Sequence, residues 1–84
     1  MNRERPPFPR NLVGLTIRRL RKSATLRISQ EDLCGRVARN GVLLTRTQIA
    51  KIEARKRPVF DYEAFSIAKA LKVSITTLYG VNEG

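Results

Sequence analysis

The sequence predicts a single all-α domain of five short helices. Apolar residues recur at helical spacing in several short segments, and residues that typically cap helices precede those segments. No stretch alternates apolar and polar residues for long enough to indicate a strand. The chain has 84 residues, 42% of them apolar, which suits one compact domain with a modest core. We expect residues 1–10, which are charged and rich in proline, to form a flexible basic arm, and residues 11–84 to form the domain.

The first predicted helix covers residues 11–23. Val13, Ile17 and Leu20 fall on one face of it, where they would pack inward. Arg18, Arg19 and Lys22 lie elsewhere around the helix. The segment 24–28 then indicates a loop before the second helix.

The second predicted helix begins at Ser29. Ser29 is a typical N-cap residue, and Asp32 three positions later completes a weak form of the capping box. Leu33 and Val37 supply the expected inner face. The pair Asn40-Gly41 is a typical stop signal, so this helix is expected to end there.

The third predicted helix, residues 45–54, has the best-defined start. Thr45 and Gln48 form a T-x-x-Q capping box. At about 100° per residue, Ile49 and Ile52 point the same way, which is toward a core. The sequence therefore predicts a helix that is anchored on one side and open on the other.

The open side of this helix is basic at two points and otherwise small, which would let DNA approach closely. Arg and Lys side chains match the paired acceptors of guanine, and the methyl groups of Thr47 and Ala50 can meet a thymine methyl. An ordinary solvated face has the same residue types, and on this helix alone that alternative stays open. The predicted base-reading residues are Arg46, Thr47, Ala50 and Lys51, with Ala54 on the same side.

Two further helices follow Pro58, which bars helix continuation from the preceding basic run. Asp61 is the predicted cap of the fourth helix, and Ser74 is the predicted cap of a short fifth one. The aromatic residues of this region are interpreted as core and lid rather than as stacking platforms for RNA bases. The predicted inner residues are Phe65, Ala68 and Leu71 with Ala64 and Ile67 beside them, then Ile75, Leu78 and Tyr79 in the fifth helix, with Phe60 and Tyr62 as core or lid.

The charge of the chain indicates a polyanionic partner. Its 17 Lys and Arg residues against 7 Asp and Glu residues give a formal charge of +10, which favours DNA or RNA ahead of membrane headgroups. A role of this charge in solubility alone is the alternative. The longest uninterrupted apolar run, Val42-Leu43-Leu44, is far too short to span a membrane, so we expect a soluble protein without a membrane partner.

Histidine is absent, and Cys34 is the only cysteine. Intrachain disulfides, His/Cys metal sites and His-based catalytic triads are therefore excluded, and a reducing, cytoplasmic location fits. Cys34 itself is expected to be a buried, unreactive thiol. We expect no enzymatic activity, no metal, no cofactor and no small-molecule ligand.

Several residues near the open side of the third helix are expected to bind DNA phosphates. Helix N-termini favour phosphates through their dipole and their free amide groups, and basic residues directly after a base-reading helix can hold the backbone on its far side. A solvated loop is the alternative for the basic run. The predicted phosphate-binding residues are Gln30, Gln48, Arg55, Lys56 and Arg57.

Glu53 lies beside the apolar stripe of the third helix, in a domain with few acids. We interpret it as a structural partner for Arg21, which would tie the third helix to the first. A catalytic carboxylate is the alternative, but no second acid or base is placed to work with it.

Four segments, taken in order, resemble the Cro/repressor-type helix-turn-helix regulators, also called Xre-like. The resemblance covers residues 13–80, which is most of the chain. Its most specific features are Gln30 after Ser29 and Glu53 at the close of the third helix. The segments are VGLTIRRLR at 13–21, SQEDL at 29–33, TRTQIAKIE at 45–53 and RPVFDYEAFSIAKALKVSITTLY at 57–79.

The resemblance implies a lambda repressor-like domain of five helices, whose second and third helices form the helix-turn-helix. It places Arg46, Thr47 and Lys51 where family members read bases, and Gln30 where they hold the DNA backbone. The ion pair that ties the first and third helices in the family corresponds to the pair suggested above for Glu53.

Members of this family commonly bind two half-sites as dimers, so the resemblance implies a homodimer on a palindromic operator. Their fifth helix often takes part in the dimer, which makes Leu78, Tyr79 and Val81 candidate dimer contacts. The chain departs from the family at Arg55 and Lys72, where glycine is common after the third and fourth helices. A left-handed backbone at each of these positions would cost on the order of 1 kcal/mol. The connections on either side of the second helix are also slightly longer.

These features predict a sequence-specific regulator of transcription, a repressor, that binds double-stranded DNA with helix 45–54 in the major groove. An antitoxin or another protein-interaction module built on the same fold is the first alternative. A non-specific nucleoid or RNA binder is the second.

Overall fold

The computed structural model describes residues 10–23 and 25–80, and in these ranges the chain is all-helical, with five helices and no strand. The predicted fold class and the predicted number of helices are therefore confirmed for this part of the chain. The predicted arm at 1–9 and the candidate dimer contact Val81 lie outside the described residues. The helices are α1 (Gly14–Arg21), α2 (Gln30–Arg39), α3 (Arg46–Glu53), α4 (Asp61–Leu71) and α5 (Ile75–Leu78).

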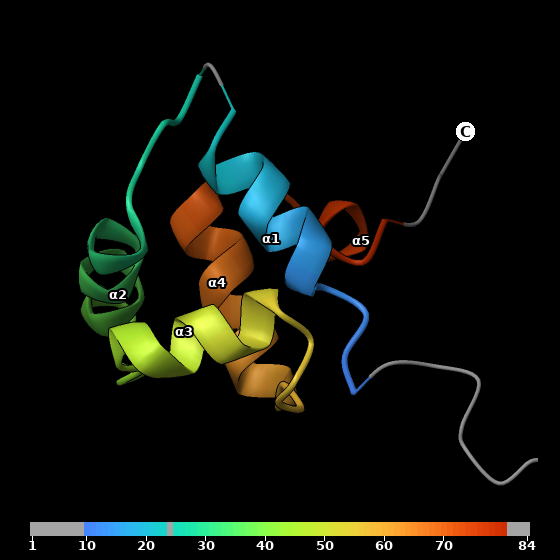
Figure 1. The fold of residues 1–84 in the computed structure, drawn as a ribbon. Coiled ribbons are helices and arrows are strands. Elements are labelled where there is room, and N and C mark those ends of the chain that lie inside the picture. The colour runs from blue at the N-terminus through green and yellow to red at the C-terminus, as the bar shows by residue number, and fades with distance from the viewer. Residues whose placement is uncertain (1–9, 24, 81–84) are drawn as a thin grey trace, which may run out of the picture.

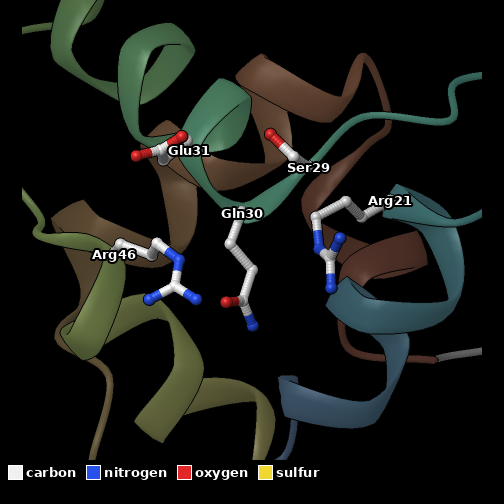
Figure 2. A pocket seen from close by; sticks show the side chains of 5 residues that line it. All are labelled: Arg21, Ser29, Gln30, Glu31 and Arg46. Atoms are coloured by element: carbon white, nitrogen blue, oxygen red, sulfur yellow. The ribbon is translucent and has the colours of Figure 1, made fainter.

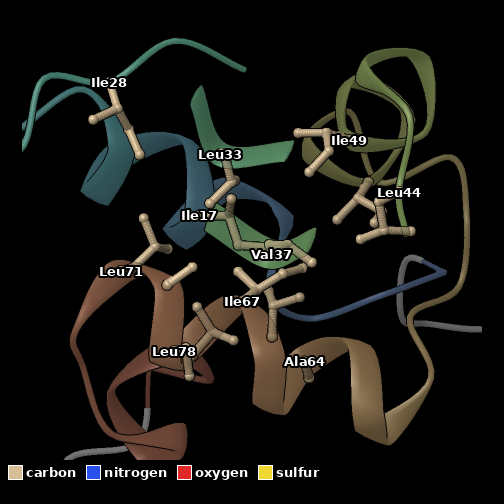
Figure 3. Close-up of a cluster of buried hydrophobic side chains, with 14 residues drawn as sticks. Ile17, Ile28, Leu33, Val37, Leu44, Ile49, Ala64, Ile67, Leu71 and Leu78 are labelled. Atoms are coloured by element: carbon tan, nitrogen blue, oxygen red, sulfur yellow. The ribbon is translucent and has the colours of Figure 1, made fainter. Parts of the chain in front are cut away.

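The helices surround one apolar core. α2 and α5 lie at opposite sides of the domain with α1 and α4 between them, and α3 runs across one end (Figure 1). Each helix contributes at least one fully buried side chain to the core (Figure 3). The largest fully buried side chains are Ile17, Leu33, Ile49, Ile52, Ile67, Leu78, Val13 and Val37.

Both predicted capping boxes are present. The Ser29 hydroxyl accepts from the Asp32 amide at 3.0 Å, and the Asp32 carboxylate accepts from the Ser29 amide at 3.1 Å. At the start of α3, the Thr45 hydroxyl accepts from the Gln48 amide at 3.1 Å, and the Gln48 side-chain oxygen accepts from the Thr45 amide at 2.9 Å. These reciprocal bonds satisfy amide groups that have no partner inside the helix, so they fix where α2 and α3 begin.

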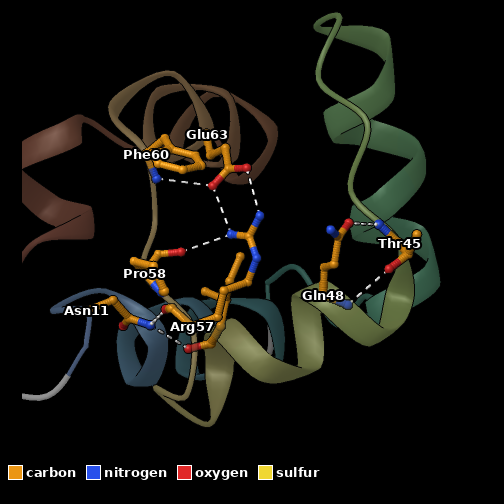
Figure 4. A network of polar contacts seen from close by, with 8 residues as sticks. Asn11, Thr45, Gln48, Arg57, Pro58, Phe60 and Glu63 are labelled. Carbon is orange, nitrogen blue, oxygen red and sulfur yellow. Dashed lines mark hydrogen bonds and ion pairs between the residues drawn. The ribbon is translucent and has the colours of Figure 1, made fainter.

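Asn11 starts α1 and also holds the end of α3. Its buried side-chain oxygen accepts from the amides of Val13 and Gly14 at 3.2 and 2.8 Å. Its amide nitrogen donates to the carbonyls of Ile52 and Arg57 at 3.1 and 2.8 Å (Figure 4). One side chain therefore ties the beginning of the domain to the segment that follows α3.

The predictions for the start of α4 and for Phe65 are wrong. Asp61 is the first helical residue and not the cap, and the amide of Phe60 before it donates to the Glu63 carboxylate at 3.1 Å. The Phe65 side chain is 60% exposed rather than buried. The inner face of α4 is instead lined by small and aliphatic side chains, because alanines let the neighbouring helices approach closely and leave no room for a ring. The inner residues are Ala64, Ile67, Ala68, Ala70 and Leu71.

Two further predictions fail in the same region. Phe60 and Tyr62 are neither core nor lid, since both are more than half exposed and their rings stack on one another with centroids 5.9 Å apart. Leu78, a candidate dimer contact, has no exposed surface at all. The short helix α5 uses Leu78 as its anchor to the core, so this residue is not available to a second chain. Tyr79 is partly buried against the core.

Arg55 and Lys72 both adopt the left-handed conformation, with φ of 61° and 62°. Each ends its helix with the same pair of backbone hydrogen bonds, which the amides of Lys56 and Arg55 make after α3 and those of Val73 and Lys72 make after α4. The sequence departs from glycine at these positions while the backbone keeps the conformation that glycine favours. Among the helices that the structure describes, none has the length and apolar character needed to cross a membrane.

Candidate DNA interface

Arg46, Thr47 and Lys51 project from α3 on the side opposite to its buried residues. All three are exposed, whereas Ile49 and Ile52 are fully buried. Within residues 10–23 and 25–80, these three side chains make no hydrogen bond or ion pair that would occupy them. The predicted separation of an anchored and an open side is therefore confirmed. We call the open side the α3 outer face; its members are Arg46, Thr47, Ala50, which is partly buried, Lys51 and Ala54.

A buried ion pair fixes the orientation of this face relative to the rest of the domain. Arg21 at the end of α1 donates to both oxygens of Glu53 at the end of α3, with distances of 2.8 and 2.9 Å. The third nitrogen of the guanidinium donates to the carbonyl of Ile28 at 3.0 Å. The hydrogen bond to Glu53 and its negative charge raise the pKa of Arg21 against the effect of burial. The predicted pairing is confirmed, and its bidentate geometry limits rotation of α3 against α1.

The Gln30 side chain has one hydrogen-bond partner inside the protein. Its amide nitrogen donates to Glu53 at 3.2 Å, so the side chain is engaged inside the protein. Figure 2 shows Gln30 in an open pocket whose walls include Arg21 and Arg46. Glu31 also lines this pocket, where its carboxylate lies among the guanidinium groups of Arg21 and Arg46. Gln30 therefore links α2 to Glu53 at the end of α3, while its second N–H makes no hydrogen bond within the described ranges, so its contact with a DNA phosphate stays a prediction.

Only the oxygen of the Gln48 side-chain amide is engaged in a hydrogen bond within the described residues. Its oxygen completes the cap of α3 by accepting from Thr45, while its amide nitrogen has no partner within the described part of the chain. The cap therefore holds a donor at the start of the α3 outer face, where a phosphate oxygen can accept from it.

The basic run after α3 separates into two kinds of residue. Arg55 and Lys56 are exposed, and their side chains make no hydrogen bond or ion pair inside the described ranges. Arg57 instead donates to both carboxylate oxygens of Glu63, at 2.9 and 3.0 Å, and to the carbonyl of Pro58 (Figure 4). The hydrogen bonds from Arg57 lower the pKa of the Glu63 carboxyl, and the same contact raises the pKa of Arg57. Arg57 thus fastens the connecting loop to α4, and we leave it out of the interface.

Three residues of structural importance to the site escaped prediction: Asn11, Gly14 and Glu63. Gly14 is tightly packed, because a Cβ there would overlap the carbonyl oxygen of Ile52. Each of the three contacts a segment that is distant in sequence or the loop after α3, which local sequence patterns do not reveal. One local signal was present for Glu63, since it stands three residues after Phe60 in the position of a capping carboxylate.

Cys34 lies partly buried on α2, and burial raises the pKa of its thiol. The thiolate, which is the reactive form, is therefore disfavoured. Within the described ranges, no three His, Cys, Asp or Glu side chains gather into a group that could hold a metal ion.

Comparison with known proteins gives no match, whether to a protein-family model, to a curated protein or to a solved structure.

Proposed function

We propose that this chain is a sequence-specific regulator of transcription, a repressor, that binds double-stranded DNA through the α3 outer face. In this proposal the domain has the lambda repressor-like fold, α2 and α3 form its helix-turn-helix, and α3 lies in the major groove. Helix order and the Arg21–Glu53 pair support this assignment, because each agrees with what the resemblance to the Xre-like regulators implies.

The observation that carries the proposal is the contrast between the two sides of α3. One side is held by Ile49 and Ile52, while Arg46, Thr47 and Lys51 stand exposed and unpaired within the described chain. A short helix that is held in place by buried side chains suits base reading. Its Arg and Lys side chains can donate to guanine, and its methyl groups can contact thymine.

An amide donor near the start of α3 and two cations just after its end supply the phosphate contacts of the proposal. Gln48 offers a donor at the start of the helix, and Arg55 and Lys56 offer cations just after its end. Contacts of this kind set the register of the helix on the duplex but carry no sequence information. With a net charge of +10, we expect affinity to fall steeply with salt, each neutralised phosphate adding about −0.9 to the log–log slope.

Selection of binding sites from randomised duplex DNA tests the proposal. We expect enrichment of one short motif, repeated as a palindrome if the chain acts as a homodimer, with half-site centres roughly 34–36 Å apart. Recovery of unrelated sequences with equal affinity would overturn sequence-specific regulation and would favour the non-specific nucleoid or RNA binder.

A protein-interaction module, such as an antitoxin, is the second candidate, and one observation favours it. Phe60, Tyr62 and Phe65 are each more than half exposed on one region of the surface. Large exposed apolar patches mark contact sites for proteins, membranes or ligands. Co-purification of a stoichiometric partner protein would favour this second candidate.

A further inference from the structure

An acidic, an aromatic and a basic side chain follow one another in a short stripe along the exposed side of α4. Asp61, Phe65 and Lys69 stand four residues apart, so each is displaced about 40° around the helix and about 6 Å along it from the one before. Asp61 and Phe65 line one open apolar pocket, and the Lys69 ammonium lies 5.8 Å from the centre of the Phe65 ring. The stripe therefore reads acid, ring, base from one end to the other.

Apolar surface surrounds the middle of this stripe. Tyr62 and Phe65 are 58% and 60% exposed, and Ile75 at the start of α5 lines the same pocket and is also exposed. The Phe60 ring extends the surface by stacking on Tyr62. We call this surface, made of Phe60, Asp61, Tyr62, Phe65, Lys69 and Ile75, the α4 patch.

From this arrangement we infer that the α4 patch is a homodimer interface, in which two copies of the chain pack α4 on α4 in antiparallel orientation. A two-fold axis at Phe65 places one Phe65 ring against the other. When the two helices cross at roughly 50°, so that their i, i+4 rows lie parallel, this axis brings Asp61 of each copy opposite Lys69 of its partner, because the two charges are equally far from the ring along the row. The patch is thus complementary to itself, which is the requirement for a two-fold interface.

Charge favours a second copy of the chain at the α4 patch over a polyanion or an acidic protein. The chain as a whole carries +10, yet the stripe holds one acid and one base and is neutral. A polyanion would be repelled by Asp61 and would gain little from the rings, while an acidic protein would find only Lys69. Two copies that meet at a neutral patch avoid the repulsion that their remaining basic surfaces would otherwise produce.

The inference replaces the predicted role of Leu78 and concerns elements separate from the α3 outer face. Because α4, Phe60 just before it and α5 provide the whole patch, the reading face on α3 stays uncovered by it. Six side chains make a small interface, so we expect weak, reversible dimers that two half-sites on DNA would reinforce. The inference rests only on the homodimer part of the proposed function.

Sedimentation of the full chain without DNA, at physiological salt and over a range of concentrations, tests the inference. We expect a monomer–dimer equilibrium for the wild type. Asp61→Lys and Lys69→Asp each place like charges opposite one another twice per dimer, and each is expected to weaken dimers about tenfold. Phe65→Ala is expected to weaken them as well, whereas Leu43→Ala, a large and exposed side chain outside the patch, leaves them unchanged.

Mixing the two charge variants gives the decisive measurement, because misfolded proteins would not regain association when they are combined. The two charge variants, each weak alone, are expected to associate when mixed in equal amounts, and the double variant Asp61→Lys/Lys69→Asp is expected to regain wild-type affinity. A monomeric wild type, or charge variants that neither weaken the dimer nor rescue one another, would overturn the inference. Such a failure would leave DNA recognition itself standing, because site selection measures that separately.

Discussion

Gly14, the first residue of α1, lies directly against the carbonyl group of Ile52 near the end of α3. A Cβ atom at position 14 would overlap this carbonyl oxygen and would also crowd the side chain of Arg55. The carbonyl belongs to helix backbone, so it cannot move aside as the end of a flexible side chain can. Glycine at this position therefore sets how closely α1 and α3 approach, and with it the placement of the α3 outer face.

Gly14→Ala is expected to destabilise the domain by about 1–3 kcal/mol, the usual range for overpacking a well-filled interior. Gly35→Ala is the matched control. It lies inside α2 with open space around it, and alanine there is expected to stabilise by about 0.5–1 kcal/mol through helix propensity. Urea unfolding of both variants measures the two effects. A Gly14→Ala protein as stable as the wild type would show that the helices are not in this close contact.

Acid is expected to weaken the fold partly through Glu63. Its hydrogen bonds from Arg57, and a further one from the amide of Phe60, hold the pKa of its carboxyl below the ordinary value. A carboxyl whose pKa is lower in the folded state contributes stability above its unfolded pKa and loses it as pH falls through the folded pKa. Wild-type stability is therefore expected to decline below about pH 5.

Glu63→Gln tests this contribution. The amide keeps an acceptor for Phe60 but removes the ion pair, so we expect a loss of about 1–3 kcal/mol at neutral pH. The gap to the wild type should close as pH falls, because the wild-type carboxyl becomes protonated. The Glu63→Gln variant keeps some acid sensitivity, because hydrogen bonds that the Asp32 carboxylate accepts from Ser29 lower the pKa of Asp32 as well. Urea midpoints between pH 7 and about pH 3 give the comparison, and a gap of constant size would contradict it.

Arg55 and Lys72, the two left-handed residues that end helices, allow stability and DNA binding to be tested separately. Arg55→Gly and Lys72→Gly each relieve a strained backbone at the same kind of helix end, and each is expected to stabilise by about 1 kcal/mol. Both variants remove one positive charge. Lys72, however, lies beside Leu20 and Leu26, at the end of α4 away from α3 (Figure 1).

Only Arg55→Gly is expected to weaken DNA binding. Its log–log dependence of affinity on salt should become shallower by about 0.9, while that of Lys72→Gly keeps the wild-type slope. Thermal unfolding together with DNA titrations at several salt concentrations measures both properties. Equal effects of the two variants on DNA affinity would remove Arg55 from the interface.

The features that the sequence predicted well are local or periodic. The capping boxes at Ser29 and Thr45 depend on residues three positions apart, and the anchoring of α3 by Ile49 and Ile52 follows from helical spacing. The Arg21–Glu53 pair spans 32 positions, but the family resemblance supplied it together with an unusual acid on the wheel.

The features that the sequence missed depend on packing between distant segments. Phe65 is adjacent to the apolar stripe of α4 on the wheel, and only the narrow space left by Ala64 and Ala68 shows that the ring must face outward. Leu78 is the one fully buried side chain of a four-residue helix, which its sequence alone does not distinguish from a dimer contact. The close contact at Gly14 involves a backbone carbonyl, which no residue type reveals.

The affinity of the chain for its selected DNA site, divided by its affinity for a scrambled duplex, tests the role of α3 most directly. Arg46→Ala and Lys51→Ala are expected to lower this ratio by about 1–3 kcal/mol each, because each would lose contacts to base edges. Lys56→Ala, at the proposed phosphate contact, should weaken both affinities alike and leave the ratio unchanged. If Arg46→Ala and Lys51→Ala left the ratio at its wild-type value, the α3 outer face would not be the surface that reads DNA.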